Sequence, residues 1–252
     1  MTIKASLDVV LPVCNEEHDL ALAVETTLSF LADNLQEYDW RIVIADNGST
    51  DNTRSVGEML ARKYPGISYV YVPQRGRGRA LRTAWLESNA DMMSYMDVDL
   101  STNLNSFPKL VQAVEEGYDI AIGSRLIGGA KVTRSLKREV ISRSYNLIIK
   151  ALFFFPFHDA QCGFKVMNRR AVRALVPLVQ NNNWFFDTEL LVIAAKRGFS
   201  VKEIPVEWIE DPDSRVGVLS TAWEDIKGLL RLRFGGIPDL APKSKNGYGR
   251  PT

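Results

Sequence analysis

The chain has few cysteines and histidines and almost no excess of charge. Its 252 residues include two cysteines, Cys14 and Cys162, and two histidines, without the spacing of a metal site, which argues against a zinc centre. So few cysteines are typical of a protein from a reducing compartment. The formal net charge of +1, without interleaved basic and aromatic residues, argues against a nucleic-acid partner.

Long apolar runs are also missing. No stretch reaches the roughly 20 apolar residues that cross a bilayer, and the longest candidate, residues 147–157, contains Lys150 and Pro156. Residues 1–8 lead directly into a predicted strand, so we expect no signal peptide. With 46% hydrophobic residues the chain can bury a full core. We expect one domain over residues 1–235 and a disordered or membrane-proximal tail over 236–252.

What the chain does have is a regular alternation of strand and helix patterns. Residues 7–13 read as a buried strand, and residues 15–35 carry apolar side chains at helical spacing. Further strands are expected at 40–46, 67–72, 92–97, 118–123 and 201–209, with another short strand after residue 165. Further helices are expected at 51–64, 78–89, 107–116, 135–155, 190–197 and 221–234. This alternation predicts an α/β fold with a Rossmann-like, mostly parallel sheet flanked by helices.

Polar segments follow the ends of four of these strands, at residues 14–17, 46–51, 97–99 and 123–125. Ligands of such sheets bind beyond the carboxyl ends of the strands. Each segment also has a simpler interpretation, because 46–51 is a glycine-containing turn with a helix cap. Glu16 and Glu17 similarly suit the positive end of a helix. Together the four segments predict one ligand site along a single edge of the sheet.

The segment Asp97-Val98-Asp99 follows the apolar run 92–96. Carboxylates two residues apart in an extended chain point to opposite faces, so one can bind a metal while the other contacts a ribose. Mg²⁺ and Mn²⁺ both favour carboxylate and phosphate oxygens. Acidic pairs are common in turns, so this motif alone is weak evidence for a metal site. The other three polar segments are needed to support it.

A basic, glycine-rich segment, residues 75–79, opens the helix expected at 78–89. Arg75 and Gly76 can present a guanidinium group and a backbone N–H to a diphosphate. The spacing is not G-x-G-x-x-G and the segment follows the third strand, which disfavours a nicotinamide cofactor. A flexible solvated loop is the alternative.

The helix expected at 135–155 begins with basic residues and ends almost entirely apolar. This arrangement suits a helix lying in a membrane interface, where lysine and arginine reach the head groups. We therefore expect membrane contact around residues 135–157. The alternative is a core helix under the sheet.

Taken together, residues 11–17, 45–51, 97–99 and 123–125 resemble the GT-A glycosyltransferases of family 2. Residues 159–165 and 184–191 resemble signatures of dolichyl-phosphate β-glucosyltransferases and related polyprenyl-phosphate glycosyltransferases. The resemblance implies an inverting, metal-dependent transfer of a hexose, glucose favoured and mannose possible, to polyprenyl or dolichyl phosphate. The implied donor is a nucleotide-diphosphate sugar, with UDP-glucose favoured, and the implied cofactor is Mg²⁺ or Mn²⁺. The resemblance also implies a peripheral location on the cytoplasmic face of a membrane.

The resemblance also implies roles for individual residues. Those for the nucleotide sugar are Pro12, Asn15, Glu17, Asp46, Gly48, Arg75, Gly76, Asp97, Val98, Asp99, Gln161 and Lys165. The residues implied for the acceptor phosphate are Arg125, Arg138, Ser142 and Arg143. The implied catalytic residues are Asp99, Arg125, Asp187 and Glu189. The implied metal ligands are Asp97 and Asp99. Ser101 stands where related mannosyl enzymes carry a glutamine ligand, so the third metal ligand stays open.

Asp187 and Glu189 fall in the first turn of a predicted helix, where the dipole stabilises carboxylates anyway. Since a phosphate monoester with a second pKa of about 6 is already dianionic near neutrality, the reaction needs no strong base. Two alternatives remain. One is a soluble GT-A transferase with a non-lipid acceptor, and the other is a nucleotide-sugar-binding module without turnover.

Overall fold

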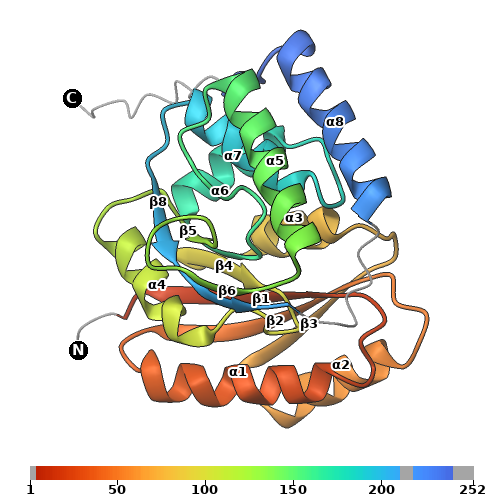
Figure 1. Ribbon diagram of the computed structural model, residues 1–252. Coiled ribbons are helices and arrows are strands. Elements are labelled where there is room, and N and C mark those ends of the chain that lie inside the picture. Colours follow the sequence, from red (N-terminus) through yellow and green to blue (C-terminus); the bar gives the residue numbers. More distant parts are fainter. Residues whose placement is uncertain (1–3, 211–217, 241–252) are drawn as a thin grey trace, which may run out of the picture.

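The computed structural model describes residues 4–210 and 218–240, apart from the side chains of 136–138, 141 and 218–222. Its centre is a seven-stranded sheet in the order β3-β2-β1-β4-β7-β5-β8 (Figure 1). The strands are β1 (Ser6–Val13), β2 (Asp39–Asn47), β3 (Ile67–Val72), β4 (Met92–Met96), β5 (Ile120–Ser124), β7 (Phe164–Asn168) and β8 (Val201–Pro205). A small second sheet pairs β6 (Lys131–Thr133) with β9 (Glu207–Ile209).

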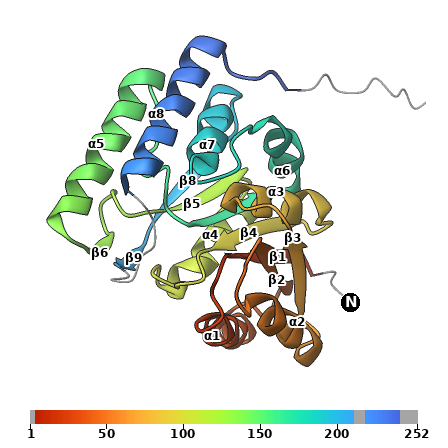
Figure 2. The ribbon, with the colours of Figure 1, turned by 90° about the vertical axis from the view of Figure 1, so that its right-hand side faces the viewer.

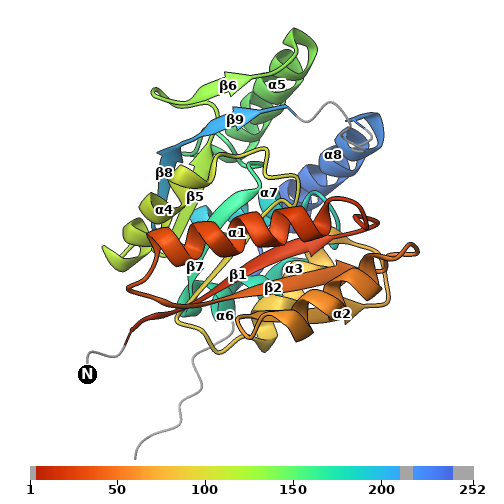
Figure 3. The same cartoon turned by 90° about the horizontal axis from the view of Figure 1, so that it is seen from below.

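Helices cover both faces of the large sheet (Figures 1 and 3). One face carries α1 (Leu20–Asn34), α2 (Thr53–Lys63) and α4 (Phe107–Glu115), which follows the short 3₁₀ helix Leu104–Ser106. The other carries α3 (Arg77–Glu87), α5 (Leu136–Phe153), α6 (Arg169–Leu175), the 3₁₀ helix Val176–Leu178, α7 (Phe186–Lys196) and α8 (Val218–Gly235). Each face has its own apolar core cluster. The predicted α/β architecture is confirmed.

The sheet is parallel except for β7, which lies antiparallel between β4 and β5. The register places Val10 of β1 opposite Val43 of β2 and Tyr95 of β4. The carboxyl ends of β1, β2, β4 and β5 therefore share one edge with the amino end of β7. All four polar segments lie at that edge, together with residues 161–163.

Several boundaries differ from those expected. α1 begins at Leu20 rather than at residue 15, because Asn15 adopts a left-handed backbone conformation with φ of 59°. The strand expected at 201–209 is divided after Pro205 into β8 and β9, which belong to different sheets. The short elements β6 and α6 were not predicted, because three and seven residues are too few to show a clear period.

α5 is partly buried in the core and partly exposed. Ile149 and Phe153 are buried in the core beneath the sheet, whereas Leu147 is 68% exposed and Phe154, at its C-cap, is 87% exposed. Among the described residues, none of the helices has the length and apolar character needed to cross a bilayer. Most of the expected tail, residues 241–252, falls outside the part of the chain that the structure describes.

Candidate active site

The loops that follow β1 and β2 are joined by hydrogen bonds at the carboxyl edge. The backbone N–H of Asn15 donates to Ser49 Oγ at 2.9 Å, and the N–H of Thr50 donates to Asn15 Oδ1 at 2.7 Å. Glu17 accepts from the N–H of Asn52 at 2.9 Å. These reciprocal bonds hold the rim of the site in place before any ligand arrives, and the left-handed conformation of Asn15 is part of that rim.

Asp46 lies beneath this rim and is fully buried. Its Oδ1 accepts from the N–H of Ser49 at 2.9 Å, and its Oδ2 accepts from the Tyr69 hydroxyl at 2.7 Å. Burial, followed by the hydrogen bond to Asp46, raises the pKa of Tyr69 well above its usual range. Asp46 therefore shapes the loop that would receive a nucleotide base. Pro12, predicted for the same pocket, is buried in β1 opposite Ala45.

Gly48 brings this loop against the basic segment that follows β3. Its φ is 76°, and a Cβ there would lie 3.0 Å from Pro73 O and 3.3 Å from the backbone nitrogen of Arg75. Gly76 is similarly close to another loop, since its Cβ would lie 2.5 Å from Asn182 O. The exposed Arg75 thus lies beside the second polar segment.

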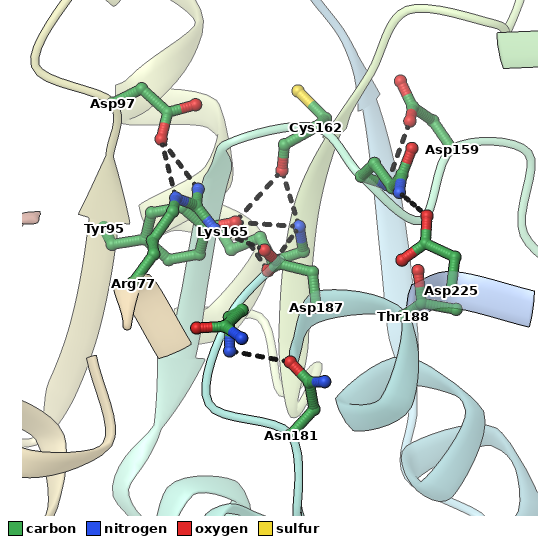
Figure 4. A network of polar contacts seen from close by, with 12 residues as sticks. Arg77, Tyr95, Asp97, Asp159, Cys162, Lys165, Asn181, Asp187, Thr188 and Asp225 are labelled. Carbon is green, nitrogen blue, oxygen red and sulfur yellow. Dashed lines mark hydrogen bonds and ion pairs between the residues drawn. The ribbon is translucent and has the colours of Figure 1, made fainter. Parts of the chain in front are cut away.

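Arg77, the first residue of α3, is the centre of the site (Figure 4). Its Nη2 and Nε donate to Asp97 Oδ1 at 2.7 and 3.2 Å, and its Nη1 donates to Asp187 Oδ2 at 2.6 Å. The guanidinium group lies between aromatic rings, 4.7 Å from the Tyr95 centroid and 5.0 Å from that of Trp184. Burial alone would lower the pKa of Arg77, but Asp97, Tyr95 and Asp187 raise it well above its usual range.

Arg77 is the main residue that our sequence analysis missed. Only Arg75 and Gly76 of the same segment were predicted as site residues. Arg77 could have been recognised by its position in the sequence, because the residue after Gly76 begins the helix at the ligand edge of the sheet. Its partner Asp187 lies 110 residues away in the chain, so spacing could not reveal the pairing.

Asp187 is buried at the start of α7 and bound by three donors. Besides Arg77, the Tyr95 hydroxyl donates to its Oδ1 at 2.6 Å, and Lys165 Nζ lies 3.0 Å from the same oxygen. Burial would raise the pKa of Asp187, but Lys165 and Arg77 hold it below its usual range. Lys165 is itself fully buried and also donates to Cys162 O at 2.5 Å. Asp187, predicted as a catalytic residue, and Lys165, predicted to bind the nucleotide sugar, form the buried base of the site.

Gly163 allows Asp97 to occupy its position. A Cβ on Gly163 would lie 1.7 Å from Asp97 Oδ2, and the backbone N–H of Asp97 donates to Gly163 O at 3.2 Å. Arg77 on one side and Gly163 on the other therefore fix the orientation of this carboxylate. Its side chain remains 39% exposed at the edge of the sheet.

Asp99 projects from the same edge and is exposed. Its Oδ1 accepts from the N–H of Ser101 at 2.9 Å, and Leu100 between them has a φ of 48°. Asp99 borders a pocket of about 440 Å³ lined also by Leu100, Ser101, Asn103, Glu207, Ile209 and Glu210. Val98, predicted with the two aspartates, is partly buried between them.

The two aspartates fit a divalent cation that a substrate helps to hold. Within the described residues, no three His, Cys, Asp or Glu side chains gather as a complete metal site. Mg²⁺ is commonly bound by one or two carboxylates together with substrate phosphates. Asp97 and Asp99 are hard oxygen donors at a site edge and match that pattern.

Arg125, after β5, is paired with Asp159. Its Nε and Nη2 donate to the two carboxylate oxygens at 2.7 and 2.9 Å, and its backbone N–H also donates to Asp159 at 3.0 Å. Burial would lower the pKa of Arg125, but the fully buried Asp159 raises it above its usual range. Nη1 makes no hydrogen bond within the described part of the chain. The predicted contact of Arg125 with an acceptor phosphate stays a prediction.

The other residues predicted to bind the acceptor phosphate belong to α5. Arg143 is 65% exposed and pairs with Glu139, and Ser142 is partly buried. The side chain of Arg138 lies outside the described residues. The structure therefore leaves the proposed phosphate contacts of α5 as a prediction.

Glu189 and Gln161 both face α8. Glu189 is fully buried, its Oε2 accepts from the N–H of Asn181 at 2.9 Å, and its Oε1 lies 2.8 Å from Arg231 Nη2. Gln161 donates to Asp225 Oδ2 at 2.9 Å. Glu189 thus stabilises the junction between α8 and the loop before α7.

A family model described as "Glycosyl transferase family 2" matches residues 8–176, which include all four polar segments and Arg77. The chain belongs to glycosyl transferase family 2. Its sequence similarity to this family identifies it as a glycosyltransferase.

Two curated relatives illustrate the similarity. Glycosyltransferase AglD of Haloferax volcanii is 36% identical over 88% of this chain. Dolichyl-phosphate beta-glucosyltransferase ALG5C of Trichomonas vaginalis is 32% identical over 90% of this chain. The chain spans 35% of the length of AglD and 71% of that of ALG5C.

A solved structure shows the same fold in another glycosyltransferase. It is glucosyl-3-phosphoglycerate synthase from Mycobacterium tuberculosis in complex with Mn²⁺, UDP-glucose and phosphoglyceric acid. The TM-score is 0.68 with 21% identity, covering 93% of this chain and 81% of the other. The GT-A fold predicted from the sequence of this protein is therefore confirmed.

Proposed function

We propose that this glycosyltransferase transfers a hexose, with glucose favoured, from a nucleotide-diphosphate sugar to a polyprenyl or dolichyl phosphate. The observation that carries the proposal is the placement of Asp97 and Asp99 at the carboxyl end of β4, beside the joined loops after β1 and β2. The relatives named dolichyl-phosphate beta-glucosyltransferase support the acceptor class.

The donor site is built from groups of both charge signs. The loops at 15–17 and 46–52 would hold the nucleoside, and the exposed Arg75 would face its diphosphate. The N–H of Gly76, predicted for the same contact, donates to Asn47 Oδ1 at 3.2 Å instead. Asp99, with Asp97, would hold Mg²⁺ or Mn²⁺. When bound, such a cation neutralises charge on a leaving diphosphate. Arg77 already compensates Asp97, which leaves Asp99 as the principal ligand.

The acceptor is a phosphate that needs charge compensation more than deprotonation. A phosphate monoester is dianionic near neutrality, because its second pKa is about 6. Arg125 Nη1, with Arg138, Ser142 and Arg143, would bind it. This agrees with the burial of Asp187 and Glu189, which are paired with Arg77 and Arg231 of the protein. Attack opposite the leaving group inverts the anomeric centre and gives a β-linked product from an α-linked donor.

We also propose that the enzyme works peripherally on the cytoplasmic face of a membrane, with α5 at the interface. The exposed Leu147 and Phe154 support this placement. The competing function is a GT-A transferase with a soluble phosphorylated acceptor, as the name of the mycobacterial structure illustrates.

An acceptor panel separates these functions. Purified protein with Mn²⁺ is supplied with radiolabelled UDP-glucose or GDP-mannose and with polyprenyl phosphate, 3-phosphoglycerate or no acceptor. We expect label to enter the lipid phase from UDP-glucose, with a β-configured product by NMR. Transfer to 3-phosphoglycerate alone would assign the enzyme to the soluble class. Absence of both transfer and donor hydrolysis would favour a binding module.

A further inference from the structure

Asp225 of α8 is a buried carboxyl group that occupies only one of its two oxygens. It is 3% exposed and lies between Asp159 and Thr188 (Figure 4). Its Oδ2 accepts from Gln161 Nε2 at 2.9 Å, whereas its Oδ1 has no hydrogen-bond partner among the described residues. A buried polar atom without a partner is uncommon in folded proteins. Neither the metal site nor the acceptor contacts proposed above make use of this group.

The position of Asp225 is fixed by the close packing of α8, which contacts α5 and α7 (Figure 2). Gly228 allows a close approach, since a Cβ there would lie 2.2 Å from the Phe185 ring. Further along the helix, Arg231 lies 2.8 Å from the fully buried Glu189. A helix held in this way presents the carboxyl group of Asp225 at a defined place.

Asp225 is in surroundings that disfavour its negative charge. Its pKa is raised to about 7, chiefly by burial. The carboxylates of Glu224 and Asp187 also favour the neutral form, while Gln161 and Tyr145 favour the charged one. None of the ion pairs formed by described residues in this region includes Asp225. Asp225 therefore acts as a hydrogen-bond partner of Gln161 rather than as one member of an ion pair.

Gln161 lies in the loop that joins the donor side of the site to the acceptor side. At the start of this loop Asp159 pairs with Arg125, and at its end Gly163 lies against Asp97. Gln161 is midway, and its backbone N–H donates to Asp159 Oδ1 at 3.2 Å. A hexose that passes from a diphosphate near Asp97 to a phosphate near Arg125 would therefore lie beside this loop.

The contact with Asp225 decides which way the amide of Gln161 faces. A side-chain amide has a donor end and an acceptor end, and its partners determine their orientation. The carboxyl oxygen of Asp225 accepts from Nε2, so the donor end is directed toward α8. Gln161 is half-buried, and its Oε1 has no hydrogen-bond partner in the part of the chain that the structure describes. This oxygen can accept a hydrogen bond from a hydroxyl group of a ligand.

We propose that Asp225 is a positioning residue that turns the carbonyl oxygen of Gln161 toward the donor hexose, where it accepts a hydrogen bond from one sugar hydroxyl. This inference rests on the proposed hexose transfer and assigns a specificity contact within it. A site that hydrogen-bonds a substrate hydroxyl rejects the analogue without that hydroxyl, because a polar group of the site is then left unpaired. Recognition of that hydroxyl thus depends on Asp225, although Asp225 itself does not touch the sugar.

The test measures kcat/KM for UDP-glucose and its monodeoxy analogues, with Mn²⁺ and a short, water-soluble prenyl phosphate as acceptor. We expect the wild type to favour UDP-glucose over one analogue by at least about tenfold, and Gln161→Leu and Asp225→Leu to lower that ratio to within about threefold. Asp225→Asn should restore the ratio, because its amide oxygen can accept from Gln161. Lys227→Leu is the matched control at an exposed position of α8 and should keep every ratio of the wild type.

A double-mutant cycle tests whether Asp225 acts through Gln161. Residues that share one contact have non-additive effects, so we expect Asp225→Leu/Gln161→Leu to retain kcat/KM for UDP-glucose within about twofold of Gln161→Leu alone. Multiplied single effects would overturn the proposal, as would unchanged analogue ratios in Asp225→Leu. Circular dichroism establishes that each variant is folded, and Asp225→Ala replaces the leucine variant if leucine prevents folding.

Calorimetric titration without an acceptor separates this inference from the proposed reaction. Transfer by Asp225→Leu with the analogue ratios of the wild type would retain the reaction and reject the role of Asp225. If the wild type binds UDP-glucose but transfers it to no prenyl phosphate, the reaction is rejected. Weaker discrimination among the analogues in binding to Asp225→Leu would then still support the role of Asp225. Failure of the wild type to bind UDP-glucose or GDP-mannose would overturn both.

Discussion

Arg77 donates two hydrogen bonds to a single oxygen of Asp97, and this pair connects the edge of the site to its buried base. The third guanidinium nitrogen of Arg77 reaches Asp187, which also binds Lys165 and Tyr95. Asp97, a carboxylate at the edge of the site, is thus oriented by a cation that is itself held from below. Removing the charge of Arg77, Lys165 or Asp187 leaves this buried group of ion pairs with one charge unbalanced.

Arg77→Ala tests this arrangement through stability. We expect the free energy of unfolding in urea to fall by about 3 kcal/mol, because Asp187 loses a charge partner while buried. Arg79→Ala is the matched control one position beyond Gly78 on α3, where a less buried arginine contacts Gln74; a loss below about 1 kcal/mol is expected there. Equal losses in the two variants would contradict the structural role of Arg77.

Gly163→Ala tests the close approach to Asp97. The new methyl group would occupy the position of Asp97 Oδ2, at 1.7 Å, so the carboxylate must turn away. We expect kcat/KM for the nucleotide sugar to fall by about tenfold or more, equivalent to roughly 1.4 kcal/mol. Gly128→Ala is the control, since no atom lies within 4 Å of its added Cβ. A wild-type rate in Gly163→Ala would show that the Asp97 orientation is unimportant.

Asp99→Asn separates catalysis from folding. The side chain is exposed at the end of β4, so we expect the melting temperature to stay close to that of the wild type while transfer is abolished. Calorimetric titration with Mn²⁺ in the presence of UDP should lose its binding signal. Asp33→Asn, an exposed aspartate on α1, should change neither property. Unchanged turnover in Asp99→Asn would remove this residue from the metal site.

Glu189→Gln distinguishes a structural carboxylate from a catalytic base. Because Glu189 contacts Asn181 and Arg231 in the protein interior, we expect a loss of about 1 to 3 kcal/mol in unfolding free energy. The pH profile of kcat, measured well below the melting temperature, should keep its shape. Loss of the alkaline or acidic limb of that profile would instead identify Glu189 as the base.

Asp225→Asn should alter how stability depends on pH. Burial raises the pKa of Asp225 to about 7, and its Oδ1 has no hydrogen-bond partner among the residues that the structure describes. The folded protein therefore binds a proton that the unfolded chain releases near its usual pKa of 3.8, so this group lowers stability as the pH rises from about 4 to 7. An asparagine remains neutral throughout and can still accept from Gln161.

We accordingly expect Asp225→Asn to unfold at a higher urea concentration than the wild type at pH 8, and to lose that advantage near pH 4. The difference at pH 8 should lie between about 1 and 4 kcal/mol, since each pKa unit corresponds to about 1.4 kcal/mol. A difference that does not change between these two pH values would show that Asp225 titrates normally.

The strand and helix periods in the sequence determined most of the fold and the location of the ligand edge. Residues 67–72 formed the expected strand because their β-branched and aromatic side chains favour an extended backbone locally. The four polar segments likewise had to meet once the strands were parallel. Local periods could not reveal that β7 enters the sheet antiparallel, because its five residues carry no information about direction.

The tertiary structure alone decided which charges face one another. Asp187 and Glu189 are two residues apart in the first turn of α7, yet one supports Arg77 and the other faces Arg231 on α8. Their directions follow from the rotation of α7 against the sheet and from the position of α8, which depend on packing over the whole chain. For the same reason, the contact between Asp225 and Gln161 emerged only when α8 was seen packed against α5 and α7.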